Sequence, residues 1–368
     1  ECLESGWVST GGRFIPEFEE KVIKYLKAKY AAGVQSGTAG LHMSLQVLGV
    51  QRDEEVIVPT LTFIAAVNPV TYLGANPVFI DCDDSLCMDP IKLEKFCSEE
   101  CEFVDGILVN KKTKRKIRVL VIVHVFGNMA DMERILDIAK KYNLKVLEDA
   151  TEALGTYYIE GRYKGKFAGT MGDIGVLSFN ANKIITTGGG GMVVGDNYDL
   201  VEKVRFLSSQ AKKDPLYFIH DEIGYNYRML NLQAALGTSQ IDQLESFIET
   251  KIKNYKIYKE ELEKIDGLEI LPFRDGIRAN HWFYSLKIDK EKYGIGRDEL
   301  LRKLVESNIQ TRPIWGLIHQ QKPYLSCQSY EMESSIYYYD RVLNLPCSSN
   351  LTEKEVYQVI EKIKEFKK

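Results

Sequence analysis

Apolar and polar positions follow two rhythms over the first 240 residues of the chain. Short runs rich in Val, Ile and Leu recur at residues 56–58, 77–81, 119–123, 145–148, 176–179 and 192–194. Between several of them, apolar residues recur every three or four positions, as in the stripe formed by Ile135, Ile138 and Ala139. Near-continuous apolar strands that alternate with helices are typical of a mainly parallel sheet covered on both faces. The pattern therefore predicts an α/β domain.

Two helices are expected before the first of these strands. Pro16 stands in the first turn of a predicted helix over residues 16–30, which has one apolar face. The segment Ser36-Gly37-Thr38 precedes a second helix, whose stripe of leucines ends at Gly49.

The rhythm changes after Asn231. A long helical stretch, broken or bent, is predicted to run to about residue 265. Thr352 and Glu355 have the spacing of a capping box at the start of the last helix. The strands expected here are 268–271 and 281–288, and the helices are 298–306 and 353–367. We therefore expect a large domain over residues 1–240 and a smaller C-terminal α+β domain over residues 241–368.

The composition of the 368-residue chain is that of an ordinary globular protein, with 45% hydrophobic and 27% charged residues. A net charge of −4 gives no reason to expect nucleic acid or an anionic membrane as a partner. The sequence contains no run of about 18 apolar residues, the length that a membrane-spanning helix needs. Seven cysteines, an odd number without metal-ligand spacing, favour reduced thiols in the cytoplasm and argue against a metal site.

Lys183 follows the strand at residues 176–179 within a short turn and precedes four glycines at residues 188–191. A fixed and partly desolvated lysine can form a Schiff base with an aldehyde cofactor. The alternative is a surface lysine in a glycine-rich loop. The flanking pattern and the segments below favour the catalytic interpretation.

Ser36-Gly37-Thr38 lies where a loop enters a helix. Backbone N–H groups at a helix N-terminus, with a hydroxyl beside them, make a phosphate-binding cup. A plain N-cap is an equally good interpretation of the segment alone. Ser178, five residues before Lys183, can supply a second hydroxyl to the same phosphate.

Asp149 ends a strand that is predicted to be central and parallel. Ligands of such sheets bind at the carboxyl ends of the strands. A buried carboxylate needs a cationic partner, and a protonated pyridine nitrogen would be one. The alternative is an Asp that caps the following turn.

Four other residues each have two interpretations. Phe63 follows a strand and can stack on an aromatic cofactor or belong to the core. Asn226 and Arg228 lie in a polar-aromatic loop, where they can reach a phosphate or form a solvated turn. His319 can face a substrate or be structural.

Seven short motifs stand in a specific order along the chain. They are Ser36-Gly37-Thr38, Pro59-x-x-Thr62-Phe63, Gly74-Ala75-x-Pro77-Val78, Glu148-Asp149-Ala150, Ser178-Phe179 to Lys183, the glycine run, and Gly224-x-Asn226-x-Arg228-Met229. In this order they resemble the DegT/DnrJ/EryC1/StrS family of pyridoxal-phosphate (PLP) sugar aminotransferases of fold type I. The resemblance covers essentially the whole chain.

The resemblance implies a mainly parallel, seven-stranded sheet and PLP as the cofactor. It also implies a homodimer with shared active sites, in which Asn226 reaches the PLP phosphate of the neighbouring subunit. The other implied roles are a Schiff-base lysine (Lys183), a pyridinium partner (Asp149), phosphate ligands (Gly37, Thr38, Ser178) and a stacked ring (Phe63).

One position departs from the family pattern. Three residues after the aspartate the family commonly carries His or Gln near the ring, and here the residue is Glu152. A carboxylate can repel negative charge there. Glu152 is therefore expected beside the cofactor, with its role open.

The first ten residues and an extra charged hairpin at residues 103–118 resemble most the subgroup that makes 4-amino sugars for legionaminic acid. The implied reaction transfers an amino group from glutamate to a nucleotide-linked 4-keto-6-deoxy sugar with a 2-acetamido group, for a bacterial surface glycan. Arg228 and His319 are candidate substrate contacts. The sugar, the nucleotide and the stereochemistry at the new amine stay open.

Two rival functions share this fold. A PLP-dependent sugar dehydratase would carry His in place of Lys183. A regulatory relative without chemistry would not need an intact pair of Lys183 and Asp149.

Overall fold

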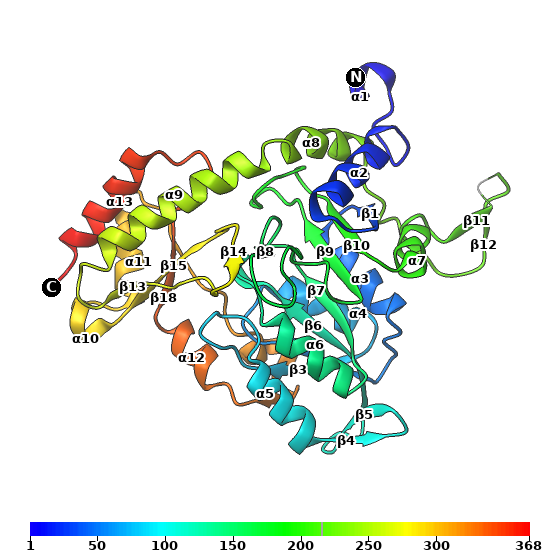
Figure 1. Ribbon diagram of the computed structural model, residues 1–368, viewed down its shortest axis with the longest axis horizontal. Helices are drawn as coiled ribbons and strands as arrows, with labels where there is room; N and C mark the ends of the chain where they lie inside the picture. Colours follow the sequence, from blue (N-terminus) through cyan, green and yellow to red (C-terminus); the bar gives the residue numbers. More distant parts are fainter. Residues whose placement is uncertain (215) are drawn as a thin grey trace.

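The computed structural model describes residues 1–214 and 216–368 of the chain (Figure 1). Its main sheet has the strand order β1-β10-β9-β7-β6-β2-β3-β17. Six neighbouring strands of this order run parallel to one another, namely β9, β7, β6, β2, β3 and β17. Strand β10 is antiparallel to both of its neighbours, β1 and β9. The strands are β1 (Tyr30–Val34), β2 (Glu55–Pro59), β3 (Asn76–Ile80), β6 (Lys116–Val123), β7 (Lys145–Asp149), β9 (Ile174–Ser178), β10 (Gly191–Gly195) and β17 (Ser329–Tyr330).

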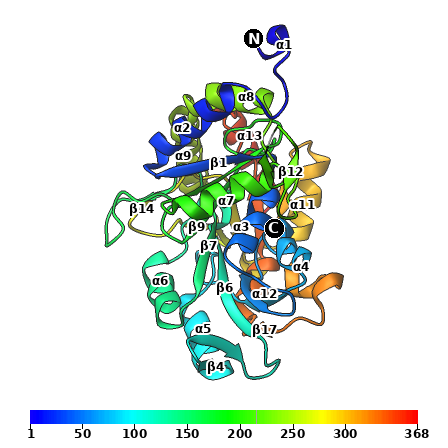
Figure 2. The ribbon, with the colours of Figure 1, turned by 90° about the vertical axis from the view of Figure 1, so that its right-hand side faces the viewer.

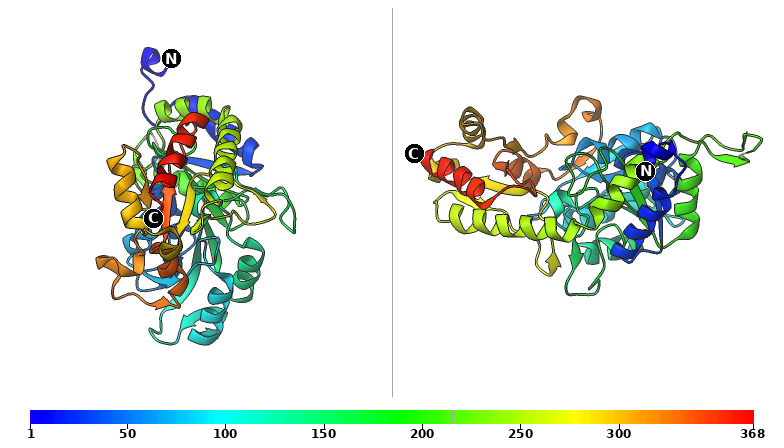
Figure 3. Two further views of the ribbon diagram at one scale, coloured as in Figure 1. Left: turned by 90° about the vertical axis from the view of Figure 1, so that its left-hand side faces the viewer. Right: turned by 90° about the horizontal axis from the view of Figure 1, so that it is seen from above.

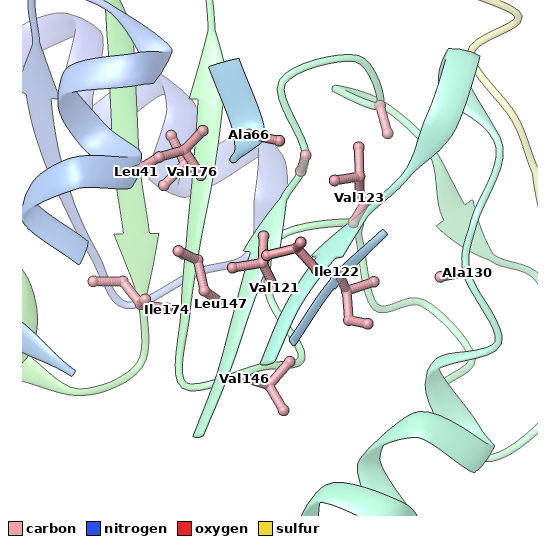
Figure 4. Packing of buried hydrophobic residues seen from close by; sticks show 14 of the residues in the cluster. Leu41, Ala66, Val121, Ile122, Val123, Ala130, Val146, Leu147, Ile174 and Val176 are labelled. Atoms are coloured by element: carbon pink, nitrogen blue, oxygen red, sulfur yellow. The ribbon is translucent and has the colours of Figure 1, made fainter. Parts of the chain in front are cut away.

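Helices cover this sheet on both faces. Every residue of β2, β9 and β10 is buried, which requires a layer on each side. Helix α3 packs across β9 and β10, and Figure 4 shows Leu41 of α3 beside Val176 of β9. The helices of this part are α1 (Cys2–Ser5), α2 (Phe14–Leu26), α3 (Gly37–Val47), α4 (Asn68–Tyr72), α5 (Pro90–Lys95), α6 (Met132–Lys141) and α7 (Tyr198–Ser208).

The first helix ends earlier than the predicted residue 30. Helix α2 ends at Leu26, because Lys27 takes a left-handed conformation with φ of 56°. Tyr30 instead begins β1, which pairs with β10. Tyr30 lies four residues after Leu26, so it continues the helical spacing of apolar positions although the chain has turned into a strand.

The expected break in the long helical stretch is present between α8 (Asn231–Ile241) and α9 (Leu244–Leu262). Helix α9 then runs alongside α13, with the C-terminal strands next to it (Figures 1 and 2). These elements are β13 (Leu268–Ile270), β15 (Tyr284–Ile288), β16 (Arg312–Pro313), β18 (Val342–Leu345), α10 (Lys290–Tyr293), α11 (Arg297–Glu306), α12 (Glu333–Tyr339) and α13 (Glu353–Glu365).

The C-terminal part builds a second hydrophobic core between α9, α11, α13 and the four-stranded sheet β13-β15-β18-β16. The chain does not stay there, since residues 314–342 pack back onto the first core and add β17 to the main sheet. The domain boundary between residues 240 and 241 stays a prediction. The capping box is formed, because Thr352 N donates to Glu355 and Glu355 N donates to Thr352 Oγ1.

Two hairpins leave the body of the molecule. The expected charged hairpin is formed by β4 (Cys101–Val104) and β5 (Ile107–Asn110), and β5 pairs with β6. With this hairpin the main sheet of the described residues has ten strands, where seven were expected. The hairpin of β11 (Lys212–Asp214) and β12 (Ile219–His220) projects far beyond α7 (Figures 1 and 3). A short pair, β8 (Tyr157–Tyr158) with β14 (Ile277–Arg278), joins the two parts of the chain.

Candidate active site

A cavity of about 310 Å³ lies at the carboxyl ends of the parallel strands. Asp149 ends β7 and Ser178 ends β9, so both side chains reach the same edge of the sheet. The predicted residues that line the cavity are Gly37, Thr38, Phe63, Asp149, Glu152, Ser178 and Lys183. A wider hollow of about 680 Å³ around Arg274 contains none of them.

The N-terminus of α3 forms one wall of this cavity. Ser36 is extended, and its Oγ accepts a hydrogen bond from Ala39 N at 3.1 Å. A Cβ atom on Gly37 would lie 3.0 Å from Thr151 and 3.1 Å from Ser178, so the glycine lets the helix approach both loops closely. The free N–H groups at this end of the helix and the Ser178 hydroxyl suit an anion.

Asp149 is almost completely buried, with 3% of its surface exposed. Its Oδ1 accepts a hydrogen bond from Thr151 N at 3.1 Å. Burial raises the pKa of Asp149, and the Thr151 contacts and the charges of Lys183 and His124 oppose the shift. Both basic groups have other partners, because His124 bonds to Glu148 and Lys183 faces Glu152.

The neighbouring Glu148 has a structural role instead. Its carboxylate accepts hydrogen bonds from His124 Nε2 at 2.9 Å and from Gly169 N at 2.8 Å. Met171 N and Gly172 N also donate to it. Glu148 therefore fixes the loop between β7 and β9, while Asp149 alone points to the cavity.

Lys183 and Glu152 form a buried pair in the cavity. Lys183 Nζ lies 3.8 Å from Glu152 Oε1, and the two side chains are 12% and 2% exposed. Burial lowers the pKa of Lys183, against the charges of Glu152 and Asp149. Burial also raises the pKa of Glu152, against the charge of Lys183. Burial is the largest cause of both pKa shifts. It biases each of the two groups toward its uncharged form.

Two tryptophans that we had not singled out as site residues complete the walls of the cavity. Trp282 and Trp315 both line it. Lys183 Nζ lies 4.0 Å from the centroid of the Trp282 ring. Trp315 packs near Phe63, with ring centroids 6.1 Å apart, and Phe63 is 53% exposed and so is not a core residue. The three aromatic residues in a row from Trp282 to Tyr284 were the signal for this wall in the sequence.

Three other predicted residues do not line this cavity. Asn226 is exposed in the loop after β12. Arg228 is bound within the fold, with its guanidinium 2.8 Å from Glu19 and donating to the carbonyl of Gly33 at 2.8 Å. His319 Nδ1 lies 2.6 Å from Thr60 Oγ1. Their roles toward a cofactor or substrate stay predictions.

The donor set fits PLP, the cofactor implied by the sequence motifs. One end of the cavity has helix N–H groups and hydroxyls for a phosphate. Asp149 is a buried carboxylate that no salt bridge within the described residues pairs, so it can accept a ring cation. Lys183 supplies a desolvated amine in the same cavity.

Comparison with known proteins agrees with this assignment. The pattern of the DegT/DnrJ/EryC1/StrS aminotransferase family matches residues 1–364. The chain is 35% identical to the GDP-perosamine synthase of Escherichia coli O157:H7, over 100% of this chain and 93% of that protein. It is 29% identical to the UDP-4-amino-4,6-dideoxy-N-acetyl-β-L-altrosamine transaminase of Campylobacter jejuni strain 81-176, over 97% of this chain and 92% of that protein.

The fold comparison gives the same answer. The structure of a DegT/DnrJ/EryC1/StrS aminotransferase from Brucella abortus matches with a TM-score of 0.89 and 25% identity. The match covers 100% of this chain and 93% of that chain. The expected fold class is confirmed.

Proposed function

Because this chain belongs to the DegT/DnrJ/EryC1/StrS aminotransferase family, whose members depend on PLP, we propose that it aminates C4 of a nucleotide-linked 4-keto-6-deoxy sugar with glutamate as donor. Its class is a PLP-dependent nucleotide-sugar aminotransferase. The observation that carries the proposal is the single cavity that holds Lys183, Asp149 and the N-terminus of α3. The dehydratase alternative loses support, because this chain has the lysine.

We assign the binding roles from the walls of the cavity. Gly37, Thr38 and Ser178 hold the cofactor phosphate at the start of α3, where the helix dipole favours an anion. Asp149 is the buried carboxylate that would keep the nitrogen of a bound cofactor ring protonated. Phe63 supplies an exposed aromatic face for the ring. Bound PLP contributes an aldehyde that accepts an amine and a ring that withdraws electrons.

Lys183 is the acid and base of the reaction. Its amine is buried, and burial lowers its pKa, so a neutral and nucleophilic fraction persists closer to neutral pH than for an exposed lysine. The same amine then moves the proton between the cofactor carbon and C4 of the sugar. Glu152, 3.8 Å away, balances the charge whenever Lys183 carries the proton.

The nature of the acceptor rests on the relatives and on the cavity. The Campylobacter jejuni transaminase is named for a UDP-linked 4-amino-4,6-dideoxy sugar with an N-acetyl group. The aromatic face of Trp315 in the cavity wall suits the apolar face of a 6-deoxy hexose. We propose a 2-acetamido acceptor of this kind, in a surface glycan pathway such as that of legionaminic acid.

We further propose that the active unit is a homodimer. The projecting hairpin carries exposed apolar side chains, namely Leu216, Tyr217, Phe218 and Ile219, and Ile223 follows it. Leu232 and Leu236, four residues apart on α8, are also exposed. Such a surface would be covered in a symmetric dimer. Asn226 is exposed and does not line the cavity of its own subunit, which supports a role in the partner's site.

The test is a panel of 4-keto sugars linked to UDP, GDP or dTDP. PLP-loaded enzyme with ¹⁵N-glutamate should convert at least one of them to the ¹⁵N-amino sugar, detected by mass spectrometry. Lys183→Ala is the matched control and should give no product. Failure with every 4-keto sugar of the panel would refute the proposed reaction.

A further inference from the structure

We infer that Trp282 and Glu152 together form a resting site for the amine of Lys183 whenever that amine is not bonded to the cofactor. The inference rests on the proposed function, because a transaminase frees its lysine in each half of the reaction. Trp282 is then a positioning residue, which acts through Lys183. We call the indole ring and the carboxylate the lysine rest.

The two parts of the lysine rest contact the same atom. Lys183 Nζ lies 4.0 Å from the centroid of the indole ring and 3.8 Å from Glu152 Oε1. An ammonium group within about 6 Å of an aromatic centroid is attracted by the ring, and most strongly where water is excluded. Only 12% of the lysine side chain and 4% of Trp282 are exposed. The contact therefore lies where this attraction is largest.

The indole is fixed by bonds at both of its ends. Its Nε1 donates to the carbonyl of Asn182 at 2.9 Å, and Asn182 directly precedes Lys183. Its backbone N donates to Asn280 Oδ1 at 2.9 Å. The ring of Phe283 stacks on it, with centroids 3.9 Å apart. The ring thus cannot turn away from the lysine without breaking a bond to the lysine's own loop.

The carboxylate is fixed by the same network. Glu152 Oε2 accepts a hydrogen bond from Phe126 N at 2.8 Å, at a residue with φ of 56°. Asn280 Nδ2 donates to the carbonyl of Glu152 at 2.9 Å. Asn280 therefore bonds to the backbone of both residues of the lysine rest, Glu152 in the N-terminal part of the chain and Trp282 in the C-terminal part.

The geometry suits reversible binding of the Lys183 amine by the lysine rest. A close ion pair would hold the ammonium too firmly to return to the cofactor, whereas 3.8 Å is longer than a hydrogen bond. The ring adds attraction without accepting a proton. A freed amine held this way stays in the cavity, next to the carbon whose proton it must move.

The first experiment reads the contact itself in cofactor-free protein. In ¹³C-lysine-labelled enzyme, the ε-CH₂ protons of Lys183 should resonate upfield of the other lysines, because they lie over the indole ring. Lys183→Met identifies the signal. Trp282→Phe should reduce the shift and Trp282→Leu should abolish it. The matched control Trp315→Leu, a tryptophan of the same cavity, should leave it in place.

The second experiment reads the consequence. Enzyme loaded with aminated cofactor should transfer its amine in a single turnover roughly 2- to 30-fold more slowly in Trp282→Leu. Trp282→Phe should restore most of the rate, and PLP affinity, measured separately, should change less than the rate. If Trp282→Leu does not fold, the partial shift and partial rate of Trp282→Phe decide.

Two results would overturn the inference. One is a Lys183 signal in wild-type protein at the position of solvent-exposed lysines. The other is an unchanged single-turnover rate in Trp282→Leu. Absence of any acceptor sugar would refute the proposed reaction, yet the shift in cofactor-free protein would still be measurable, so the two failures can be told apart.

Discussion

Asp149→Asn separates the charge of this residue from its shape. The side chain is 3% exposed at the end of β7, and its Oδ1 accepts a hydrogen bond from Thr151 N at 3.1 Å. An asparagine has the same outline and can keep that bond through its own Oδ1. The variant should therefore fold and form the cavity, with only the negative charge missing.

The size of the effect follows from the burial of this charge. Two opposite charges about 4 Å apart attract by about 4 kcal/mol at an effective dielectric constant of about 20. Each loss of about 1.36 kcal/mol in the transition state costs a factor of ten in rate. Without the carboxylate the ring nitrogen loses its proton and the ring withdraws electrons poorly. We expect amine transfer to slow by about 10³-fold.

The assay has two parts. Equilibrium titration should show that Asp149→Asn still binds PLP, since the phosphate contacts at α3 are untouched. Stopped-flow rates should then fall in both half-reactions, with KM for the sugar nearly unchanged. A PLP-loaded Asp149→Asn enzyme that keeps more than a tenth of the wild-type rate would show that Asp149 only caps its turn.

The same variant gives a signed pH effect in cofactor-free protein. Burial raises the pKa of Asp149 above its ordinary value of 3.8, so between the two values the native state binds more protons than the unfolded state. Stability contributed by this group therefore falls as pH rises through that window. Asp149→Asn should lose this fall and be at least as stable as wild type at pH 7 in urea unfolding. A less stable variant would mean that the protein itself pairs the charge.

Three further predictions test the rest of the site. Lys183→Ala should fold but lose about 10²–10⁴-fold or more in rate. Borohydride treatment should attach no PLP to the active-site peptide of this variant. Retention of more than a tenth of the wild-type rate would refute the role of Lys183 as acid and base. Ultracentrifugation should show a homodimer burying over about 2,000 Å², and Asn226→Ala should weaken PLP retention without unfolding; a fully active monomer would contradict this. Gly127→Ala should lower the free energy of unfolding by about 2–4 kcal/mol. Gly127 has φ of 90°, and a Cβ added there would lie 1.9 Å from Asn280 Oδ1. An unchanged unfolding curve in urea would refute this prediction.

The residues that could be predicted are those that directly follow apolar strands. Asp149 and Ser178 end neighbouring parallel strands, and Lys183 lies in the turn after the second. In a parallel sheet these ends meet at one edge whatever the loops do. Local pattern was therefore enough to bring them together, and all three residues line one cavity.

Other residues could not be placed, because their partners lie far away in sequence. Trp282 reaches Lys183 only after about a hundred residues of intervening chain, with no periodicity to mark it. Arg228 has the same chemistry whether it binds a substrate or pairs with Glu19, as it does here. Sequence states which group is available, and only the packing states which partner it meets.

None of the helices in the described residues is both long and apolar enough to cross a bilayer. Several of the exposed apolar side chains lie on the hairpin of β11 and β12 and on α8.

Glu152 shows how structure changes the meaning of a single departure. From sequence, a carboxylate in place of His or Gln suggested repulsion of negative charge near the ring. In the fold, one carboxylate oxygen accepts the N–H of Phe126 and the other faces Lys183 at 3.8 Å. The charge is thus directed at groups of the protein. Burial raises the pKa of Glu152 and lowers that of Lys183, and the charge of each group opposes the shift of the other. The carboxylate at this position therefore faces the lysine, and in the proposed lysine rest a neutral His or Gln would leave the freed ammonium with the indole ring alone.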